Sequence, residues 1–198
     1  MMTGGFDRLL QLHGEALAVV FARIDEVRRQ IEREDGFEVI DQVRSRIKTP
    51  QSIENKLRGL GLEPTCAHAQ EHLRDIAGIR IIALYAKAVE SLVRALRTLP
   101  DLTIVTEKDY IGCPKPSGYR SYHLIVAVQI EGEPVFVEIQ LRTQAMDFWA
   151  SLEHKVRYKY HGHIPQHLSD ELAKVADQIA QLDQRMFLIQ EIISLINE

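Results

Sequence analysis

Apolar residues recur at helical spacing near both ends of the chain and alternate with polar residues through its middle. Between residues 6 and 34 they lie three or four positions apart, and residues 168–196 carry them at near-heptad spacing. Shorter stretches at residues 50–60, 86–99 and 145–160 show the same one-sided pattern. The pattern therefore predicts a long amphipathic helix at each end and three shorter helices between them.

Between these helices the sequence has the character of strands. Extended segments are predicted at residues 43–48, 79–84, 102–105, 123–130 and 135–142. In the last of them apolar residues occupy every second position, so Glu138, Gln140 and Arg142 share the opposite face. Such a strand is usually a solvent-exposed edge, but a face of Glu, Gln and Arg rather than one rich in Lys and Thr favours a functional site. Residues 63–70 are expected to form a loop. Together the elements predict one α+β domain with a mixed sheet of about five strands flanked by helices.

The composition narrows the class of protein. Hydrophobic residues make up 45% of the 198 positions and charged residues 26%, which is typical of a globular protein. The net charge of −4 argues against a general binder of polyanions, although cations cluster at residues 44–58 and 108–120. No apolar run approaches a membrane span and no signal peptide is recognised. We therefore expect a cytoplasmic protein without a membrane partner, with Cys66 and Cys113 reduced.

A turn-rich loop precedes the strand predicted at residues 123–130. Two prolines and two glycines within residues 112–118 exclude a helix there and stiffen the backbone. The loop places four basic or aromatic side chains at the start of the strand: Lys115, Tyr119, Arg120 and His123. We interpret it as a nucleotide-binding loop in which Tyr119 stacks on the base and the cations contact phosphates.

Two acidic residues border or lie within apolar strands, Asp75 and Glu138. Carboxylates in such positions are rarely buried without a partner. Together they would suit Mg²⁺, which commonly takes one or two protein carboxylates plus nucleotide phosphates, and one of them could accept the proton of a hydroxyl nucleophile. The plainer alternative is that Asp75 caps a turn and pairs with Arg74 or Arg80, while Glu138 faces water.

Six cations supply what a site for two polyphosphates needs: Arg46, Lys48, Lys56, Arg80, Lys115 and Arg120. Preplaced Arg, Lys and Mg²⁺ stabilise the charge that develops on a transferred phosphoryl group. Taken singly, each cation is better explained as part of a solvated basic face. The sequence has neither a P-loop nor a Rossmann glycine motif, so its phosphates would be bound by side chains.

Four longer motifs carry a resemblance to a known family. They are HLRDIAGIR at residues 72–80, PKPSGYRSYH at 114–123, VEIQLRT at 137–143 and AMDFWASLEHK at 145–155. Arg46-Ile47-Lys48 and residues 52–56 extend the match to roughly residues 37–160. The chain resembles a small alarmone synthetase of the RelA/SpoT family.

The resemblance implies a fold and an activity. The fold is a nucleotidyltransferase-like synthetase domain spanning residues 1–198, with its core at about 37–160 and terminal helices at about 6–34 and 168–196. The activity is transfer of pyrophosphate from ATP to the 3′-hydroxyl of GTP or GDP, which gives (p)ppGpp and AMP with Mg²⁺ as cofactor. Longer members carry a hydrolase domain and a regulatory tail that this sequence lacks, so synthesis without degradation is expected. Relatives of this size also imply a homotetramer built through the terminal helices, and RNA is a candidate regulator.

The resemblance implies roles for single residues on the donor side. Asp75 would hold Mg²⁺, and Glu138 would assist with the metal and activate the 3′-hydroxyl. Arg46 and Arg80 would sandwich adenine. Three residues would face the ATP phosphates: Lys48, Ser52 and Lys56.

On the acceptor side the resemblance implies that Tyr119 stacks on guanine. Four further residues would surround the acceptor nucleotide: Lys115, Arg120, His123 and Gln140. Asp147 stands where some relatives carry Asn, and its carboxylate could accept from the N1–H and 2-amino groups of guanine. Asp147 is therefore a candidate specificity residue.

Two other functions remain open. The same donor chemistry could act on another acceptor, either an adenine nucleotide or the 3′ end of tRNA. Alternatively, the chain could be a non-catalytic nucleotide or RNA sensor on the same fold. The presence of both Asp75 and Glu138 argues against a sensor.

Overall fold

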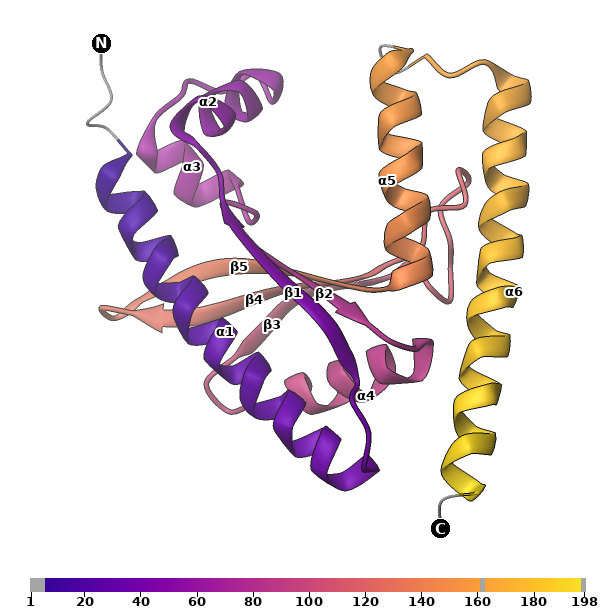
Figure 1. Ribbon diagram of the computed structural model, residues 1–198. Helices are drawn as coiled ribbons and strands as arrows, with labels where there is room; N and C mark the ends of the chain where they lie inside the picture. The colour runs from indigo at the N-terminus through magenta and orange to yellow at the C-terminus, as the bar shows by residue number, and fades with distance from the viewer. Residues whose placement is uncertain (1–5, 161–162, 197–198) are drawn as a thin grey trace.

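The computed structural model describes residues 6–160 and 163–196. Along the chain the elements are α1 (Asp7–Asp35), β1 (Ile40–Ile47), α2 (Pro50–Gly59), α3 (Cys66–His72), β2 (Ala77–Ala83), α4 (Ala86–Arg97), β3 (Thr103–Asp109), β4 (Tyr122–Ile130), β5 (Glu133–Thr143), α5 (Gln144–Lys159) and α6 (Gln166–Ile196). The strands form a mixed sheet in the order β1-β2-β5-β4-β3, in which β2 and β5 run parallel and the other neighbours antiparallel. The α+β fold and the long terminal helices predicted from the sequence are confirmed (Figure 1).

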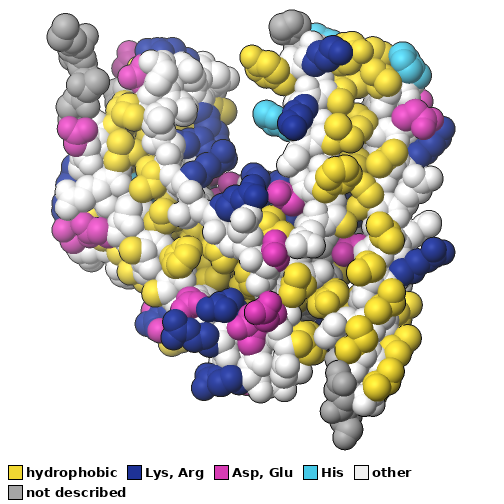
Figure 2. Space-filling view, viewed as in Figure 1, with side chains coloured by type: hydrophobic (Ala, Val, Ile, Leu, Met, Phe, Trp, Pro, Cys, Tyr) yellow, Lys and Arg dark blue, Asp and Glu magenta, His cyan; other side chains and the backbone are white. Residues whose placement is uncertain are grey.

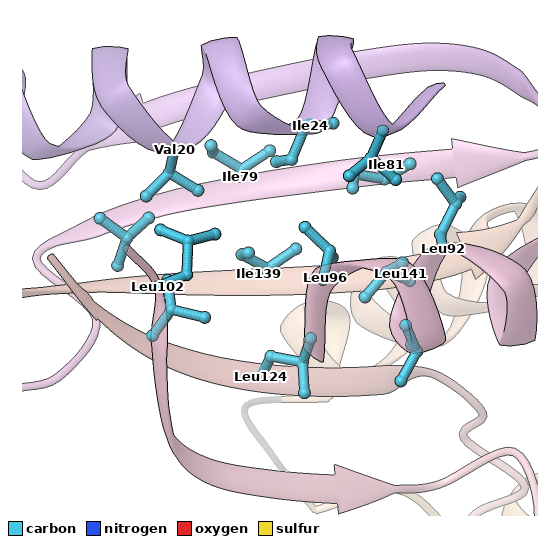
Figure 3. Close-up of a cluster of buried hydrophobic side chains, with 14 of the residues drawn as sticks. Val20, Ile24, Ile79, Ile81, Leu92, Leu96, Leu102, Leu124, Ile139 and Leu141 are labelled. Atoms are coloured by element: carbon cyan, nitrogen blue, oxygen red, sulfur yellow. The ribbon is translucent and has the colours of Figure 1, made fainter. Parts of the chain in front are cut away.

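Helices α1 and α4 cover one face of the sheet (Figure 1). Val20 and Ile24, which recur at helical spacing in α1, pack in one cluster with Ile79 of β2 (Figure 3). Burying such a side chain contributes about 1.5–3 kcal/mol. Helix α1 ends where Gly36 takes a left-handed conformation, with a φ angle of 77°. The main core therefore lies between the sheet and these two helices, and the opposite face of the sheet is left for polar residues.

Strand β5 lies in the middle of the sheet, between β2 and β4. It follows β4 through a two-residue turn, Glu131-Gly132, in which both φ angles are positive (52° and 84°), as a type I′ hairpin requires. The usual alternative, a solvent-exposed edge, therefore does not apply to this strand. Alternation along one strand cannot reveal which strands flank it.

Residues 63–70, which were expected to form a loop, contain the start of helix α3. Thr65 caps this helix, because its hydroxyl oxygen accepts a hydrogen bond from the backbone N–H of His68 (3.2 Å). Ala69 is the buried residue of α3, and it joins a second, smaller core with residues of α2 and of the segment before β2: Ile53, Leu57, Leu73 and Ile76. A seven-residue helix with so little buried surface has too weak an apolar period to be predicted.

Helices α5 and α6 pack beside each other, across from α2 and α3 (Figure 1). Trp149 of α5 is buried between them and donates a hydrogen bond to the carbonyl oxygen of Leu172 (2.9 Å). The C-terminal half of α6 leaves large apolar side chains exposed, namely Leu182, Met186, Leu188, Ile189, Ile192, Ile193, Leu195 and Ile196. Within the described residues, no helix combines the length and the apolar character that a bilayer crossing requires.

Candidate active site

The face of the sheet opposite α1 and α4 is hollowed between α2 and α5. Figure 2 shows Lys, Arg, Asp and Glu side chains gathered in this hollow. A cavity of about 250 Å³ lies here, lined by residues of three strands: Arg44, Ser45 and Arg46 of β1, Gly78, Ile79 and Arg80 of β2, and Glu138 and Gln140 of β5. The polar face predicted for β5 is therefore part of a cavity.

The register of the strands brings these residues together. Gly78 of β2 lies opposite Glu138 of β5. Two positions further along, Arg80 lies opposite Gln140, which in turn lies opposite His123 of β4. Because residues at every second position share a face, both rows contribute to one polar surface.

Asp75 lies just before β2 and is held by two lysines. Its Oδ2 atom accepts hydrogen bonds from Nζ of Lys48 (2.9 Å) and Nζ of Lys56 (2.5 Å). Burial alone would raise the pKa of Asp75, but the hydrogen bonds from Lys56 and Lys48 outweigh burial and hold this pKa below its ordinary value. The other oxygen, Oδ1, is buried without a hydrogen-bond partner among the described residues. Asp75 thus pairs with lysines rather than with Arg74 or Arg80.

Glu138 projects from β5 on the cavity side. Its Oε2 atom accepts a hydrogen bond from Nε2 of Gln140 (3.0 Å), and its Oε1 atom lies 3.6 Å from Nδ1 of His123. Burial would raise the pKa of Glu138, but His123 and Gln140 lower it by more, so the pKa lies below its ordinary value. The Glu138 side chain is 17% exposed. It is therefore an ionised, largely buried carboxylate rather than one that faces bulk water.

The two acids fit a single hard cation. They are close enough for the charge of Asp75 to oppose the lowering of the Glu138 pKa. The unpartnered Oδ1 of Asp75 supplies a free ligand oxygen. Among the described residues no group of three or more His, Cys, Asp or Glu could hold a metal. A carboxylate pair matches Mg²⁺, which fills its remaining positions with water and phosphate oxygens.

Tyr119 lies beside the same polar surface. Its hydroxyl lies 2.8 Å from Nε2 of His123 and accepts a hydrogen bond from Nη2 of Arg142 (2.7 Å). The ammonium group of Lys115 is 4.9 Å from the centre of the Tyr119 ring and 4.6 Å from that of Tyr110. The structure therefore brings three of the predicted acceptor-side residues together, and Gln140 joins them through Arg142 (3.3 Å).

Helix α6 supports the loop that carries Tyr119. Gly118 is buried with a φ angle of 89°, and a Cβ atom at this position would come within 2.5 Å of Cβ of Ala176. Arg120 donates a hydrogen bond to Asp177 of α6 (2.8 Å). Arg120 is thus held by α6, and Tyr119 packs against a cluster that includes Ala176 of the same helix.

The residues predicted for ATP lie toward α2. Arg46 is exposed on β1 and is near enough to Arg80 to help lower the pKa of Arg80, a shift caused first by burial and then by Arg142. The hydroxyl of Ser52, in the first turn of α2, lies 2.9 Å from Oγ1 of Thr49, and Lys56 lies one turn further along. Arg46 is the exposed cation of this group, whereas Lys48 and Lys56 are paired with Asp75 and Arg80 approaches Asp147.

Sequence reasoning gave no role to Arg142, which is buried within this surface. Its Nη1 atom donates to Oδ1 of Asp147 (3.1 Å), an oxygen that Arg80 also approaches (3.5 Å). Asp147 therefore contacts both Arg80, which is predicted to bind ATP, and Arg142, which lies among the residues predicted to bind GTP. The sequence feature that could have identified Arg142 is its position on the same face of the strand as Glu138 and Gln140.

Comparison with known proteins shows the family of the chain. The family model described as "Region found in RelA / SpoT proteins" matches residues 45–163, more than half of the chain. The chain belongs to the RelA/SpoT family. The matched span of this RelA/SpoT protein runs from β1 past α5 and contains every predicted site residue from Arg46 to Asp147.

Individual RelA/SpoT relatives are similar over most of their length. GTP pyrophosphokinase YwaC of Bacillus subtilis is 45% identical over 160 residues, which cover 79% of this chain and 76% of YwaC. The small alarmone synthetase 1 of Bacillus subtilis bound to its product pppGpp superposes with a TM-score of 0.83 at 33% identity, covering 96% of this chain and 98% of that one. The same synthetase bound to AMPCPP gives a TM-score of 0.75 at 32% identity, covering 95% and 97%.

Proposed function

We propose that this RelA/SpoT protein is a GTP pyrophosphokinase that transfers pyrophosphate from ATP to the 3′-hydroxyl of GTP or GDP. The observation that supports the proposal is a pair of partly buried carboxylates, Asp75 bound by two lysines and Glu138 beside His123, in which the charge of Asp75 affects the pKa of Glu138. Relatives named GTP pyrophosphokinases, and a neighbouring structure with pppGpp, support the same reaction.

The donor would lie on the α2 side of the hollow. Arg46 and Arg80 present guanidinium planes that can stack on adenine from two sides. Three residues would bind its phosphates: Lys48, Ser52 and Lys56. The lysines are held by Asp75 in the structure described, so a triphosphate would compete with that carboxylate for them. The neighbouring structure with AMPCPP, an ATP analogue, supports this donor.

The acceptor would lie on the loop side. The ring of Tyr119 would stack on guanine. Three polar residues would surround the acceptor nucleotide: Lys115, His123 and Gln140. Arg120 would contribute only after releasing Asp177. Asp147 would read the guanine edge with Oδ2, because both arginines approach Oδ1.

The chemistry follows from these positions. Glu138 is an ionised carboxylate and accepts the proton of the acceptor 3′-hydroxyl. The 3′-oxygen forms a bond to the β-phosphorus of ATP as the bond from that phosphorus to the α,β-bridging oxygen breaks, and AMP leaves with the bridging oxygen. Lys48 and Lys56 stabilise the charge that moves onto the phosphates. Mg²⁺ held by Asp75 and Glu138 would supply further charge neutralisation.

The test is to incubate purified protein with ATP, Mg²⁺ and one acceptor, and to separate the products by anion-exchange chromatography. We expect AMP and a guanosine tetra- or pentaphosphate in equal amounts from GDP or GTP, and formation of both about 10²- to 10⁴-fold slower with Glu138→Gln. pppGpp incubated with the protein in the absence of ATP should not be hydrolysed, because the protein is proposed to synthesise the guanosine product without degrading it. Formation of ADP rather than AMP would overturn the pyrophosphate transfer.

The same assay with an acceptor panel separates the remaining alternatives. An adenine nucleotide or the 3′ end of tRNA as the preferred acceptor would replace GTP in the proposal. A nucleotide sensor would bind ATP and GTP without consuming either. A parallel series with added RNA tests the candidate regulator.

We also propose that the protein is a cytoplasmic homotetramer assembled through its terminal helices. The exposed apolar side chains of the C-terminal half of α6 support this assembly, because a helix in water rarely leaves so many uncovered. Multi-angle light scattering should give a mass four times that of one chain. A monomer at micromolar concentration would contradict it.

A further inference from the structure

Arg142 is a buried cation in the middle of the acceptor side. Its side chain is 7% exposed. Its guanidinium group donates to four oxygen atoms: the hydroxyl of Tyr119 (2.7 Å), Oδ1 of Asp147 (3.1 Å), Oε1 of Gln140 (3.3 Å) and Oγ of Ser121 (3.4 Å). A guanidinium has a rigid fork of donors and no acceptor, so it fixes the orientation of every group that it binds.

Two routes lead from Arg142 to the two oxygens of Glu138. In one, Arg142 donates to Oε1 of Gln140, and the amide nitrogen of Gln140 donates to Oε2 of Glu138 (3.0 Å). In the other, Arg142 donates to the hydroxyl of Tyr119, which lies 2.8 Å from Nε2 of His123, while Nδ1 of His123 lies 3.6 Å from Oε1 of Glu138. Arg142 thus orients both side chains that contact this carboxylate.

In the second route, which group donates each hydrogen bond determines which nitrogen of His123 carries the proton. Since Arg142 donates to the oxygen of Tyr119, the hydroxyl proton is free to point at Nε2 of His123. Nε2 then accepts from Tyr119, and the N–H group of the ring lies at Nδ1, where it faces the carboxylate of Glu138. The opposite arrangement would turn the lone pair of Nδ1 toward the negative charge, which is unfavourable.

We propose that Arg142 is a positioning residue, which through Tyr119 and Gln140 directs the Nδ1–H group of His123 toward Glu138 and fixes the carboxylate of Glu138 for the acceptor 3′-hydroxyl. The inference rests on the proposed role of Glu138 as the base. Asp147 is the counter-charge that keeps Arg142 in place, a duty separate from any contact with guanine.

The test compares four variants with the wild-type protein. Arg142→Met removes all four hydrogen bonds, and Tyr119→Phe breaks only the route through His123 while keeping the ring. Arg142→Lys keeps the charge but loses the fork. Arg94→Met removes an exposed arginine from α4, on the other face of the sheet, and serves as the matched control.

The first readout is the tautomer of His123, observed by two-bond ¹H–¹⁵N correlation spectra of protein labelled with ¹⁵N-histidine and assigned with His123→Gln. We expect the Nδ1–H form in the wild-type protein and in Arg94→Met, and a tautomer mixture in Arg142→Met and Tyr119→Phe. A wild-type His123 in the Nε2–H form, or an unchanged pattern in Tyr119→Phe, overturns the inference. Tyr119→Phe keeps this test decisive if Arg142→Met does not fold.

The second readout is steady-state kinetics. Arg142→Met should lower kcat/KM for GTP on the order of 10- to 100-fold, as loss of an outer hydrogen-bond partner typically does, while the KM for ATP changes less than about twofold. Arg142→Lys should recover part of the loss. Equal losses for ATP and GTP would indicate a purely structural role and refute the inference. If the wild-type protein yields no guanosine product but His123 behaves as expected, the proposed function fails and the hydrogen-bond arrangement stands.

Discussion

Gly118→Ala would test whether the nucleotide loop depends on its close packing against α6. The residue has a φ angle of 89°, and an alanine in this left-handed region costs about 1–2 kcal/mol. The added Cβ would also lie 2.5 Å from Cβ of Ala176 and 3.3 Å from Cα of Ala173, both in α6. Because these atoms belong to a helix, α6 or the loop must move, and overpacking of this kind typically costs about 1–3 kcal/mol.

The chain offers a matched control in Gly132. This glycine has a similar φ angle of 84°, but a Cβ atom there would meet nothing within 4 Å. Gly132→Ala should therefore lose only the conformational part, about 1–2 kcal/mol, whereas Gly118→Ala should lose about 2–5 kcal/mol. The difference between the two variants isolates the steric clash with α6.

The assay is urea unfolding followed by circular dichroism, at one protein concentration because assembly contributes to stability. The KM for GTP should rise in Gly118→Ala, since the displaced loop carries Tyr119, and should stay unchanged in Gly132→Ala. If the two variants lost equal stability, within about 0.5 kcal/mol, α6 would not constrain the loop as the structure indicates.

Three further predictions follow from other parts of the molecule. Glu138→Gln should lower kcat about 10²- to 10⁴-fold, the usual contribution of a general base. Titration calorimetry should show that the variant still binds AMPCPP. An unchanged kcat would show that Glu138 is not the base. Burial raises the pKa of Asp183, and the hydrogen bond from Thr143 only partly offsets this effect. An acid with a raised native pKa destabilises the fold above that pKa and ceases to do so below its ordinary pKa. Asp183→Asn should therefore stabilise the protein at neutral pH, and this gain in stability should disappear as the pH falls toward the ordinary pKa of Asp. Unfolding curves at several pH values measure the gain. An equal gain at every pH would show that the pKa of Asp183 is not raised. Ile192→Asp, in the exposed apolar part of α6, should shift light-scattering mass toward smaller species, and an unaltered mass would place the assembly surface elsewhere.

The hydrophobic pattern was sufficient to predict most of the fold. The buried residues of α1 and α4 recur at helical spacing, and those of β4 and β5 alternate, so these elements are visible without a structure. Helix α3 was missed because it depends on the cap at Thr65 and on Ala69 rather than on an apolar stripe. The central place of β5 depends on pairing with β2, and a single strand carries no record of its neighbours.

The candidate site shows the same division. Residue patterns singled out Asp75, Glu138 and Tyr119, and the resemblance implied roles for them. The sheet register explains why Arg80, His123 and Gln140, far apart in sequence, share one surface. Arg142 and the Arg80–Asp147 contact could not be predicted, because hydrogen-bond partners depend on side-chain directions that spacing does not specify. Arg120, which follows Tyr119 in sequence, was predicted to contact the acceptor nucleotide, but in the structure it contacts Asp177 of α6.

The parallel pairing of β2 with β5 has a consequence for how the protein is made. Asp75 precedes β2, whereas Glu138 lies on β5, which the ribosome adds only after α4, β3 and β4. Because β5 lies between β2 and β4, a nascent chain that has emerged only as far as β4 cannot yet join the strand after Asp75 to the rest of the sheet. The polar cavity can therefore form only after β5 has been synthesised.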